Sequence, residues 1–396
     1  LDAEGKWEVV SKPDWCTLSA MSGEKKTELT LTIDEGAENR EGEIIFKLEE
    51  YDYTTTCIIS QYFYEYDEDE GISLQIHKKG NGINLVFLGD GFDAEDIANG
   101  SYLRVMNEQM ERFFDIEPYH TYRDYFNVST AIAVSPESGI GTVNTVRNTK
   151  FETTFTGGVG LRGNYSAIFN YAMEVSPVDE SNLNQSLIVV TPNTIDYGGI
   201  TEMWTDGSAI AFCPLSEDSY PYDARGIIQH EAGGHGFGKL GDEYIYHNAF
   251  IDFCDCTCCE HVFEFNIAKS LGWYENLSLT GKMHEVPWSH LIFDDRYSDV
   301  VDIYEGGFKH ARGVFRSEQN SCMNNNISYY NAISREAIVK RIMEYAGESY
   351  SFEKFVENDK RDVVNSLSRS AERSGVTVRG NQYAPRIHKG KPDILK

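Results

Sequence analysis

Hydrophobic and polar positions alternate over the first 66 residues of the chain, in several short stretches. Examples are "TELTLTI" and "EGEIIFKLEEY", which are separated by turn-forming segments such as "KPD" and "AENREG". Alternation with a period of two predicts β-strands with one buried face, and several such strands in a small unit predict an antiparallel β-sandwich. We therefore assign residues 1–66 to an N-terminal antiparallel β-sandwich.

The pattern changes after residue 66. The stretch "EYDEDEG" is acidic and has no apolar periodicity, and we interpret residues 67–77 as an acidic linker. Further on, continuous apolar runs at 82–92, 125–135 and 185–193 predict buried strands, and 93–116 has the apolar spacing of helices. Buried strands and helices in one region predict a mixed sheet covered by helices.

The whole chain is therefore predicted to be an α+β multidomain protein, whose second domain, residues 78–396, is an α/β domain of catalytic type. Its 35 basic and 63 acidic residues give a formal net charge of -28. This charge argues against binding to nucleic acid or to anionic lipid surfaces. No apolar run approaches the roughly 18 residues that span a bilayer, so we expect no transmembrane segment. The chain starts at Leu1 without Met, from which we expect that a leader has been removed.

The stretch "RGIIQHEAGGHGFGKLGDEY", residues 225–244, contains the strongest candidate chemistry. A zinc hydrolase needs two imidazoles on one helical face, a carboxylate between them to accept a proton from water, and a third ligand from elsewhere. His230, Glu231 and His235 supply the first three groups, but the histidines are five residues apart instead of the four of H-E-x-x-H. On a regular α-helix they would diverge, at about 140° around the axis.

A single wide helical turn of the π type would bring positions i and i+5 back to one side, and such turns are frequent at functional sites. Gly233 and Gly234 make this distortion sterically easy, although each costs about 1 kcal/mol in a helix. The alternative is a glycine-rich loop that contains two histidines by accident. The spacing itself is similar to the H-E-x-x-G-H variant of the dipeptidyl peptidase III family, which "HEAGGH" matches at every position.

The N-terminal region resembles the BACON (Bacteroidetes-associated carbohydrate-binding often N-terminal) domain. The resemblance rests on "PDWCTLS" with Pro13 and Trp15, "NREGEIIF" with Asn39, Arg40 and Gly42, and "TTTCIISQ", which ends in Gln61. It implies carbohydrate as a partner of this domain, and an immunoglobulin-like spacer without a ligand is the alternative. We expect Trp15 to pack in the core rather than to form a sugar platform.

The second domain resembles the bacterial IgA-peptidase family of zinc metalloendopeptidases. The matching stretches, which recur in the same order, are "NLVFLGDGF" (84–92), "VSPESG" (134–139), "HGFGKLGDEY" (235–244), "VPW" (286–288), "EGGFKHARGVFRSEQNSCM" (305–323) and "YNAISREAI" (330–338). In addition, Gly238 follows the second histidine by three residues, as in metzincins, where a glycine turns the chain toward the third ligand. The resemblance therefore implies a metzincin-like zinc metallopeptidase domain.

Carried over to this sequence, the resemblance implies that His230 and His235 are Zn²⁺ ligands and that Glu231 is the general base. The metzincin spacing would place the third ligand at Gly241, which cannot coordinate, so the next residue, Asp242, is expected to take this role. Glu243 is the fallback. Met323, in "SCM", would be the methionine that lies under the metal, and ordinary core packing is the alternative for it.

Other residues raise weaker expectations. Tyr244 or Tyr246 is a candidate for assisting the oxyanion. We expect five further histidines to be surface or structural residues rather than metal ligands. They are His247, His261, His284, His290 and His310. Four of the eight cysteines form the cluster "CDCTCC" at 254–259, which disulfides, a structural metal shared with His261, or free thiols would each explain.

The sequence thus predicts a secreted or cell-surface zinc metalloendopeptidase that hydrolyses peptide bonds of protein or glycoprotein substrates and is expected to be a monomer. Both resemblances imply export to the bacterial cell envelope or the extracellular space. One alternative is a non-catalytic surface protein that binds glycan or mucin and retains a vestigial zinc helix. Another is a zinc hydrolase that acts on amide bonds other than peptides.

Overall fold

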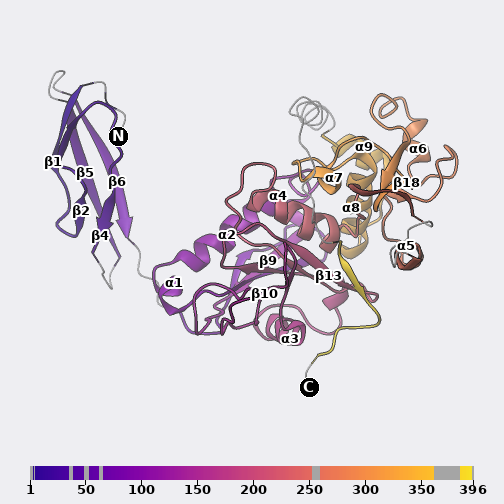
Figure 1. Ribbon diagram of the computed structural model, residues 1–396, viewed down its shortest axis with the longest axis horizontal. Coiled ribbons are helices and arrows are strands. Elements are labelled where there is room, and N and C mark those ends of the chain that lie inside the picture. Colours follow the sequence, from indigo (N-terminus) through magenta and orange to yellow (C-terminus); the bar gives the residue numbers. More distant parts are fainter. Residues whose placement is uncertain are drawn as a thin grey trace. The chain divides into compact units, whose positions relative to one another are not determined.

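The computed structural model describes residues 3, 5–34, 39–48, 53–61, 66–251, 259–360 and 384–394. The chain divides into two compact units, Leu1–Tyr66 with Glu95–Ser101 and Asp67–Ala94 with Tyr102–Lys396. Each unit has its own sheets, and Figure 1 labels some of their strands.

The first unit contains two antiparallel sheets around one core. The four-stranded sheet has the order β3-β1-β5-β6, with β1 at Lys6–Ser11, β3 at Ser22–Glu24, β5 at Arg40–Leu48 and β6 at Tyr53–Gln61. The two-stranded sheet pairs β2, Cys16–Leu18, with β4, Leu31–Ile33. Alternate residues of both sheets point into the shared core, whose buried members are Ala3, Trp7, Cys16, Leu18, Ile44, Phe46 and Ile59. The antiparallel strands predicted from the period-two alternation are therefore confirmed.

Trp15 packs against this core and is only partly buried. The guanidinium of Arg40 lies over its ring, 4.6 Å from the centroid, and the Arg40 Nε donates a 2.6 Å hydrogen bond to Oε1 of Gln61. Gly42 lies so close to Pro13 that a Cβ at this position would overlap the proline ring. The residues that carry the sequence resemblance of this region therefore contact one another in the fold.

The second unit is built on a seven-stranded mixed sheet in the order β19-β13-β14-β12-β8-β9-β7. Its strands are β7 (Gly71–Gln75), β8 (Ile83–Asp90), β9 (Phe126–Ala131), β12 (Leu187–Pro192), β13 (Ile200–Trp204), β14 (Ala209–Phe212) and β19 (Arg386–His388). Strands β9, β8, β12 and β14 run parallel, whereas β13 is antiparallel to β14 and β7 is antiparallel to β9. The three predicted buried strands correspond to β8, β9 and β12, and every residue of β8 and β12 is buried.

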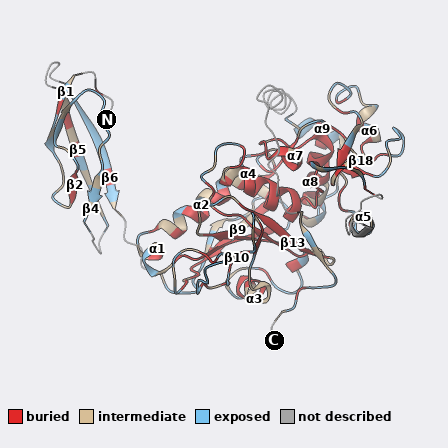
Figure 2. Ribbon diagram, viewed as in Figure 1, coloured by how far each residue is buried: buried red, intermediate tan, exposed pale blue. Residues whose placement is uncertain are grey.

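Helices lie on both sides of this sheet. The described helices of the second unit are α2 (Ser101–Phe114), α3 (Tyr165–Val175), α4 (Ala224–Ile228), α5 (Cys259–Ser270), α6 (Ser289–Ile292), α7 (Cys322–Asn325), α8 (Ala332–Tyr345) and α9 (Phe352–Asn358). A short helix, α1 (Ala94–Ala98), falls almost wholly in the first unit. Figure 1 shows α3 on the opposite side of the sheet from α4 and α8. Figure 2 shows that the buried residues are concentrated in the strands of this sheet and in the helices on the side of α4 and α8.

A smaller sheet of four strands follows in the chain. It contains β15 (Ile245–Phe250), β16 (Leu277–Ser278), β17 (Tyr304–Gly307) and β18 (Lys309–Arg316), with β18 paired to each of the other three. A hairpin of β10 (Thr154–Phe155) and β11 (Leu161–Arg162) lies apart from both sheets. Single-turn 3₁₀ helices occur at Arg123–Tyr125 and Leu183–Gln185.

Part of the segment expected to be a linker, residues 67–77, belongs to the large sheet. Gly71–Gln75 form strand β7, which pairs with β9, and the Asp69 N–H donates a 3.0 Å hydrogen bond to the carbonyl of Ile132. The side chains of β7 are exposed or half-buried, so this edge strand has no apolar pattern that would reveal it in the sequence.

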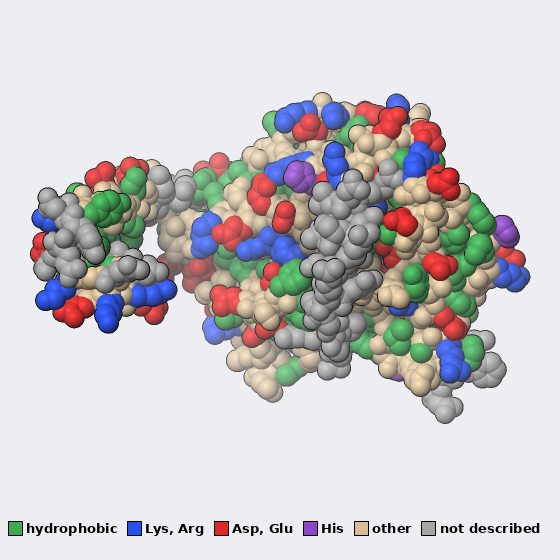
Figure 3. All heavy atoms as spheres, turned by 90° about the horizontal axis from the view of Figure 1, so that it is seen from above, with side chains coloured by type: hydrophobic (Ala, Val, Ile, Leu, Met, Phe, Trp, Pro, Cys, Tyr) green, Lys and Arg blue, Asp and Glu red, His purple; other side chains and the backbone are tan. Residues whose placement is uncertain are grey.

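The described part of the chain contains no helix long and apolar enough to cross a membrane. On the face that Figure 3 shows, acidic and basic side chains are interspersed, so the excess of negative charge does not gather in one patch there. Of the cysteine cluster, residues 254–258 and the side chain of Cys259 lie outside the described residues.

Candidate metal centre

The histidine stretch forms a wide helical turn. Asp223 caps α4 by accepting a 3.0 Å hydrogen bond from the N–H of Gly226, and the helix continues from Gln229 to Phe237 as a π-helix. Within it the N–H of Gly238 donates to the carbonyl of Gly233, five residues earlier, at 2.9 Å. The wide turn expected from the five-residue spacing is confirmed. Every residue of this segment is buried.

Two tyrosines stabilise the distorted turn. The hydroxyl of Tyr119 donates a 2.6 Å hydrogen bond to the carbonyl of Gly233, and the hydroxyl of Tyr330 donates to the carbonyl of Gln229. Both carbonyls belong to the segment in which the α-helical hydrogen-bond register is interrupted, and buried carbonyls require donors. A Cβ at Gly233 would overlap the Tyr330 hydroxyl, so the tyrosines can approach only because this residue is glycine.

The side chain of Met323 packs directly under Gly234. A Cβ at Gly234 would overlap Sδ of Met323, which is fully buried. The carbonyl of Met323 also accepts a 2.8 Å hydrogen bond from the N–H of Glu243. Met323 therefore joins the π-helix to the acidic residues that follow it.

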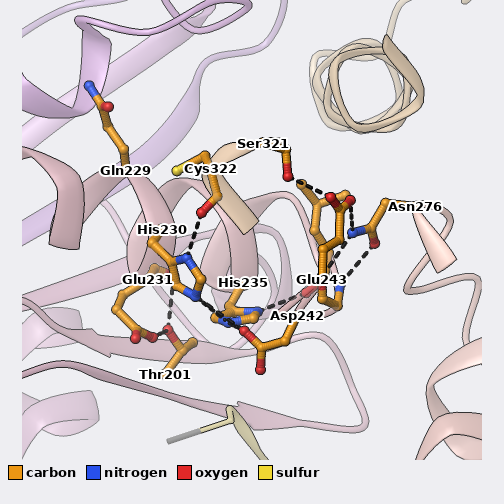
Figure 4. Close-up of polar contacts among 12 residues, drawn as sticks. Thr201, Gln229, His230, Glu231, His235, Asp242, Glu243, Asn276, Ser321 and Cys322 are labelled. Atoms are coloured by element: carbon orange, nitrogen blue, oxygen red, sulfur yellow. Dashed lines mark hydrogen bonds and ion pairs between the residues drawn. The ribbon is translucent and has the colours of Figure 1, made fainter. Parts of the chain in front are cut away.

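The wide turn brings three side-chain atoms together, as Figure 4 shows. Nε2 of His230 and Nε2 of His235 are 3.1 Å apart, and Oδ1 of Asp242 is 3.2 Å from the first and 3.1 Å from the second. His235 and Asp242 are fully buried, and His230 is nearly so. Among the described residues, these three form the one group of His, Cys, Asp and Glu side chains with converging ligand atoms.

Backbone carbonyls determine which imidazole nitrogen carries the proton. Nδ1 of His230 is 2.9 Å from the carbonyl oxygen of Cys322, and Nδ1 of His235 is 2.8 Å from that of Leu240. Because a carbonyl can only accept, each Nδ1 must be an N–H donor. In the neutral imidazoles, both Nε2 atoms therefore present lone pairs toward each other and toward the Asp242 carboxylate. Such an arrangement requires a cation or an additional proton between the three atoms.

The donor set and its dimensions fit a zinc ion. Two imidazoles and one carboxylate are a ligand set of catalytic zinc sites, in which a fourth position stays open for water or substrate. Tetrahedral ligands at 2.0–2.1 Å from zinc are about 3.3 Å apart, and the three distances here are 3.1–3.2 Å. The Nδ1–H hydrogen bonds to carbonyls are the interactions that orient metal-binding imidazoles in proteins.

The charges of the site support the same interpretation. Burial and the two imidazoles act in opposite directions on Asp242, and the imidazoles hold the pKa of Asp242 far below its usual range. Burial disfavours the charged form of His230, but the hydrogen bond to Asp242 and the negative charges of Glu231 and Asp242 outweigh it and raise the pKa of His230. The site thus stabilises positive charge at its centre.

Glu231 lies beside this centre and points toward strand β13. Oε2 of Glu231 accepts a 2.8 Å hydrogen bond from the hydroxyl of Thr201. Burial raises the pKa of Glu231, and the nearby His235 and His230 only partly offset this. A Cβ at Gly199 would be 3.0 Å from Cγ of Glu231, so glycine gives the carboxylate its space.

A small cavity opens at Glu231. It is lined by Val159, Tyr197, Gly198, Gly199, Ile227, His230, Glu231 and Asn326. Its volume of about 10 Å³ is close to the smallest that accommodates one water molecule. The carboxylate of Glu231 and the imidazole of His230 therefore share access to one small space.

Glu243, the fallback ligand in the sequence analysis, points away from the imidazoles. Its carboxylate accepts hydrogen bonds from the Ser321 hydroxyl at 2.6 Å and from the side-chain amides of Asn276 and Asn331 at 2.8 and 2.7 Å. Three donors thus occupy the Glu243 carboxylate, which ties the site loop to α7 and α8. Burial raises the pKa of Glu243, and these donors oppose the rise.

The two candidate tyrosines are placed differently. The ring of Tyr244 is fully buried and stacks near the ring of His230, with centroids 6.4 Å apart and planes 21° apart. Burial, followed by the charge of Asp242, raises the pKa of Tyr244 well above its usual value. Tyr246 lies beyond Tyr244, with ring centroids 4.8 Å apart.

Residues 73–268 match the family model described as IgA Peptidase M64. The predicted family is confirmed. Residues 5–61 match the model of the BACON family, an N-terminal domain to which a binding role is ascribed. The M64 match includes the π-helix, Glu231 and Asp242. A search of curated proteins found no match to the chain. The M64 family supports a peptidase, and the BACON family supports a binding domain.

The sequence indicated the groups of this candidate site that are neighbours in the chain and, through the family resemblance, Met323. Thr201 and Tyr119 contact the π-helix from distant elements, and no motif marked them. Tyr330 lies in the matched stretch "YNAISREAI", but its contact with the π-helix was not predicted. The two carbonyls that orient the imidazoles belong to the backbone, which the sequence does not reveal.

Proposed function

We propose that the chain is an exported zinc-dependent metalloendopeptidase with a metzincin-like active site. In this proposal His230, His235 and Asp242 hold the ion, and Glu231 is the general base. The observation that carries the proposal is the convergence of two imidazole Nε2 atoms and one carboxylate oxygen beside a second buried carboxylate, with the Nδ1 atom of each imidazole hydrogen-bonded to a backbone carbonyl. The M64 match supports peptide bonds as the substrate class.

The residues of the chain have separate roles in this mechanism. When bound, zinc would act as a Lewis acid on the scissile carbonyl and the attacking water. Glu231 accepts a proton from that water at its carboxylate and delivers it to the leaving amine nitrogen. A raised pKa suits a carboxylate that must first take up and then release a proton. Thr201 fixes the orientation of the carboxylate through its hydroxyl.

The Met323 contact with Gly234 and the distance from His235 to Asp242 support the metzincin-like part of the proposal. Met323 packs beneath the turn that carries the ligands, and the chain leaves the helix after Gly238. The third ligand comes one residue later than in the metzincin pattern because Gly241 has no side chain to coordinate with.

Replacing Glu231 with Gln tests the proposed base. The Glu231→Gln protein should bind one zinc ion at the centre with unchanged affinity, because Glu231 is not a ligand, and should lose hydrolysis of a peptide library by at least about 100-fold. Zinc content is measured by elemental analysis after dialysis, and the exposed residue Glu217 provides the matched control, Glu217→Gln. Peptide hydrolysis that persists in Glu231→Gln would refute the assigned base.

The BACON match favours one alternative, a surface protein whose N-terminal domain binds glycan and whose second domain is inactive. Zinc separates the two proposals. Metal that binds the purified protein and is lost from this centre on His230→Ala supports the enzyme. Protein that takes up no zinc at this centre but binds glycan on an array supports the binding protein.

A further inference from the structure

Three histidines outside the M64 centre lie next to one another. Strands β15 and β18 pair in parallel with His247 opposite His310, and helix α5 brings His261 to the same place. The ring of His310 is 5.6 Å from that of His247 and 5.4 Å from that of His261, measured between centroids. The sequence predicts each of them to be a surface or structural residue, and the fold brings them together.

The contact between two of these rings has the dimensions of a metal site. Nδ1 of His261 and Nε2 of His310 are 3.1 Å apart. Two nitrogen ligands of a tetrahedral zinc ion are about 3.3 Å apart, so this pair needs little movement to share one ion. Imidazole is also the ligand that zinc, copper and nickel prefer among neutral side chains.

His310 is buried, and the only hydrogen bond of its ring that the described residues supply is the one between Nε2 and His261. His310 has no exposed surface, and its Nδ1 has no hydrogen-bond partner among the described residues. Burial, the neighbouring His261 and His247, and Lys309 together lower the pKa of His310 to about 4. The ring is therefore neutral at physiological pH and offers a lone pair rather than a positive charge.

We propose that His261 and His310 bind a second transition-metal ion of the zinc type and that the exposed side chain of His247 turns toward them to complete the site. The ion then fastens β15 and α5 to β18. The exposed ring of His247 would provide the route by which the ion enters. Four cysteines lie in the sequence between His247 and His261, but their side chains are outside the described residues and the proposal does not depend on them.

The second ion would act on the loop that carries the third ligand of the M64 centre. The N–H of Phe308 donates a 2.8 Å hydrogen bond to the carbonyl of Asp242, and the N–H of Lys309 donates a 3.0 Å hydrogen bond to the carbonyl of Tyr244. His310 is the next residue. An ion at His310 therefore stabilises the strand that holds the backbone of Asp242 in place. Binding at this second site is independent of the proposed peptidase activity.

Zinc stoichiometry of the full chain tests this inference. The wild-type protein should bind two zinc ions, and the His230→Ala/His235→Ala variant should keep one. Adding His247→Ala and His261→Ala to that background should remove the remaining ion, whereas adding His284→Ala, at an exposed histidine outside the cluster, should not. Circular dichroism spectra checked at each step show whether the variants fold.

A milder variant avoids loss of fold as an explanation. His261→Gln in the His230→Ala/His235→Ala background should weaken zinc binding at least about 10-fold and remove the zinc-dependent rise in melting temperature. X-ray absorption at the zinc edge should show imidazole scattering. The proposal is overturned if zinc stays bound at full affinity without the histidines, or if only replacement of Cys254, Cys256, Cys258 and Cys259 by Ser removes it. It is also overturned if the background variant binds no zinc.

Discussion

Asp242 and Glu243 are adjacent acidic residues whose environments differ completely. Asp242 directs one oxygen at two imidazole nitrogens, whereas Glu243 receives three hydrogen bonds from neutral side chains. Side-chain direction, not charge, separates a candidate ligand from a structural anchor here. The path of the chain after the π-helix determines which of the two residues faces the histidines. The sequence alone therefore could not decide whether Asp242 or Glu243 is the third ligand.

Paired substitutions should distinguish these roles. Asp242→Asn keeps the size of the side chain but removes its charge and should weaken zinc binding by more than about 100-fold, which titration calorimetry measures. Glu243→Gln places an amide where Asn276 and Asn331 donate, so it should leave zinc affinity within a few-fold but lower the free energy of unfolding by about 1–3 kcal/mol. The reverse pattern of effects would exchange the two assignments.

A second residue-scale effect concerns pH. Burial raises the pKa of Glu318 to about 7, and its carboxyl group accepts a 2.8 Å hydrogen bond from the N–H of Ala332 at the start of α8 and contacts the Tyr329 hydroxyl. Because the folded-state pKa lies above the usual value of 4.5, the folded protein binds the proton more tightly than the unfolded chain. The contribution to stability is therefore complete below about pH 4.5 and is lost as the pH rises to about 7.

We expect this group to lower the free energy of unfolding by up to about 3 kcal/mol between pH 4.5 and pH 7. Glu318→Gln mimics the protonated form, since its amide oxygen can still accept from Ala332 and its NH₂ can donate to Tyr329. Urea denaturation at several pH values should show a smaller decline for Glu318→Gln than for the wild-type protein. Equal slopes would show that Glu318 titrates normally.

At the scale of elements, the π-helix depends on contacts from both sides. Tyr119 and Tyr330 satisfy its carbonyls on one side, and Met323 fills the space below Gly234. The sequence predicted the wide turn from the spacing of His230 and His235 and from the two glycines. It could not predict the two tyrosines, because no local pattern links them to the π-helix, whereas the family resemblance had indicated Met323.

The contact between Gly234 and Met323 can be measured by a double-mutant cycle. Gly234→Ala should destabilise the protein by about 1–3 kcal/mol because its methyl group overlaps the thioether. Met323→Ala should cost about 2–5 kcal/mol through the cavity that it leaves. The added methyl group partly fills that cavity, so the double variant should be more stable than the sum predicts, by about 0.5–3 kcal/mol. Strict additivity would mean that the two residues do not touch.

At the scale of the whole molecule, the two units have separate cores and separate family matches. The first domain and the buried strands of the second were predictable because their apolar periodicity is strong. The sequence did not predict where the linker ends, because the exposed edge strand β7 has the composition of a solvated segment. The cysteine cluster, where three interpretations were open, stays undecided because it lies outside the described residues.

The position of β7 leads to a prediction about truncation. A chain that begins at Asp67 retains the pairing of β7 with β9 and the ion pair of 2.8 Å between Lys150 and Asp69, and it should bind zinc as the full chain does. A chain that begins at Lys78 exposes the edge of β9 and should melt at a lower temperature, which scanning calorimetry detects. Equal melting temperatures would place residues 67–77 in the linker after all.

The carbonyls of Leu240 and Cys322 hold the proton on the far nitrogen of each imidazole. Main-chain oxygens do this, so a change of side chain at either position leaves the acceptor in place, provided that the new side chain fits the packing. Most point mutations around the centre should therefore leave unchanged which nitrogen of each imidazole carries the proton. Only a change in the path of the polypeptide, such as an insertion between His235 and Asp242, would turn the nitrogen lone pairs away from each other.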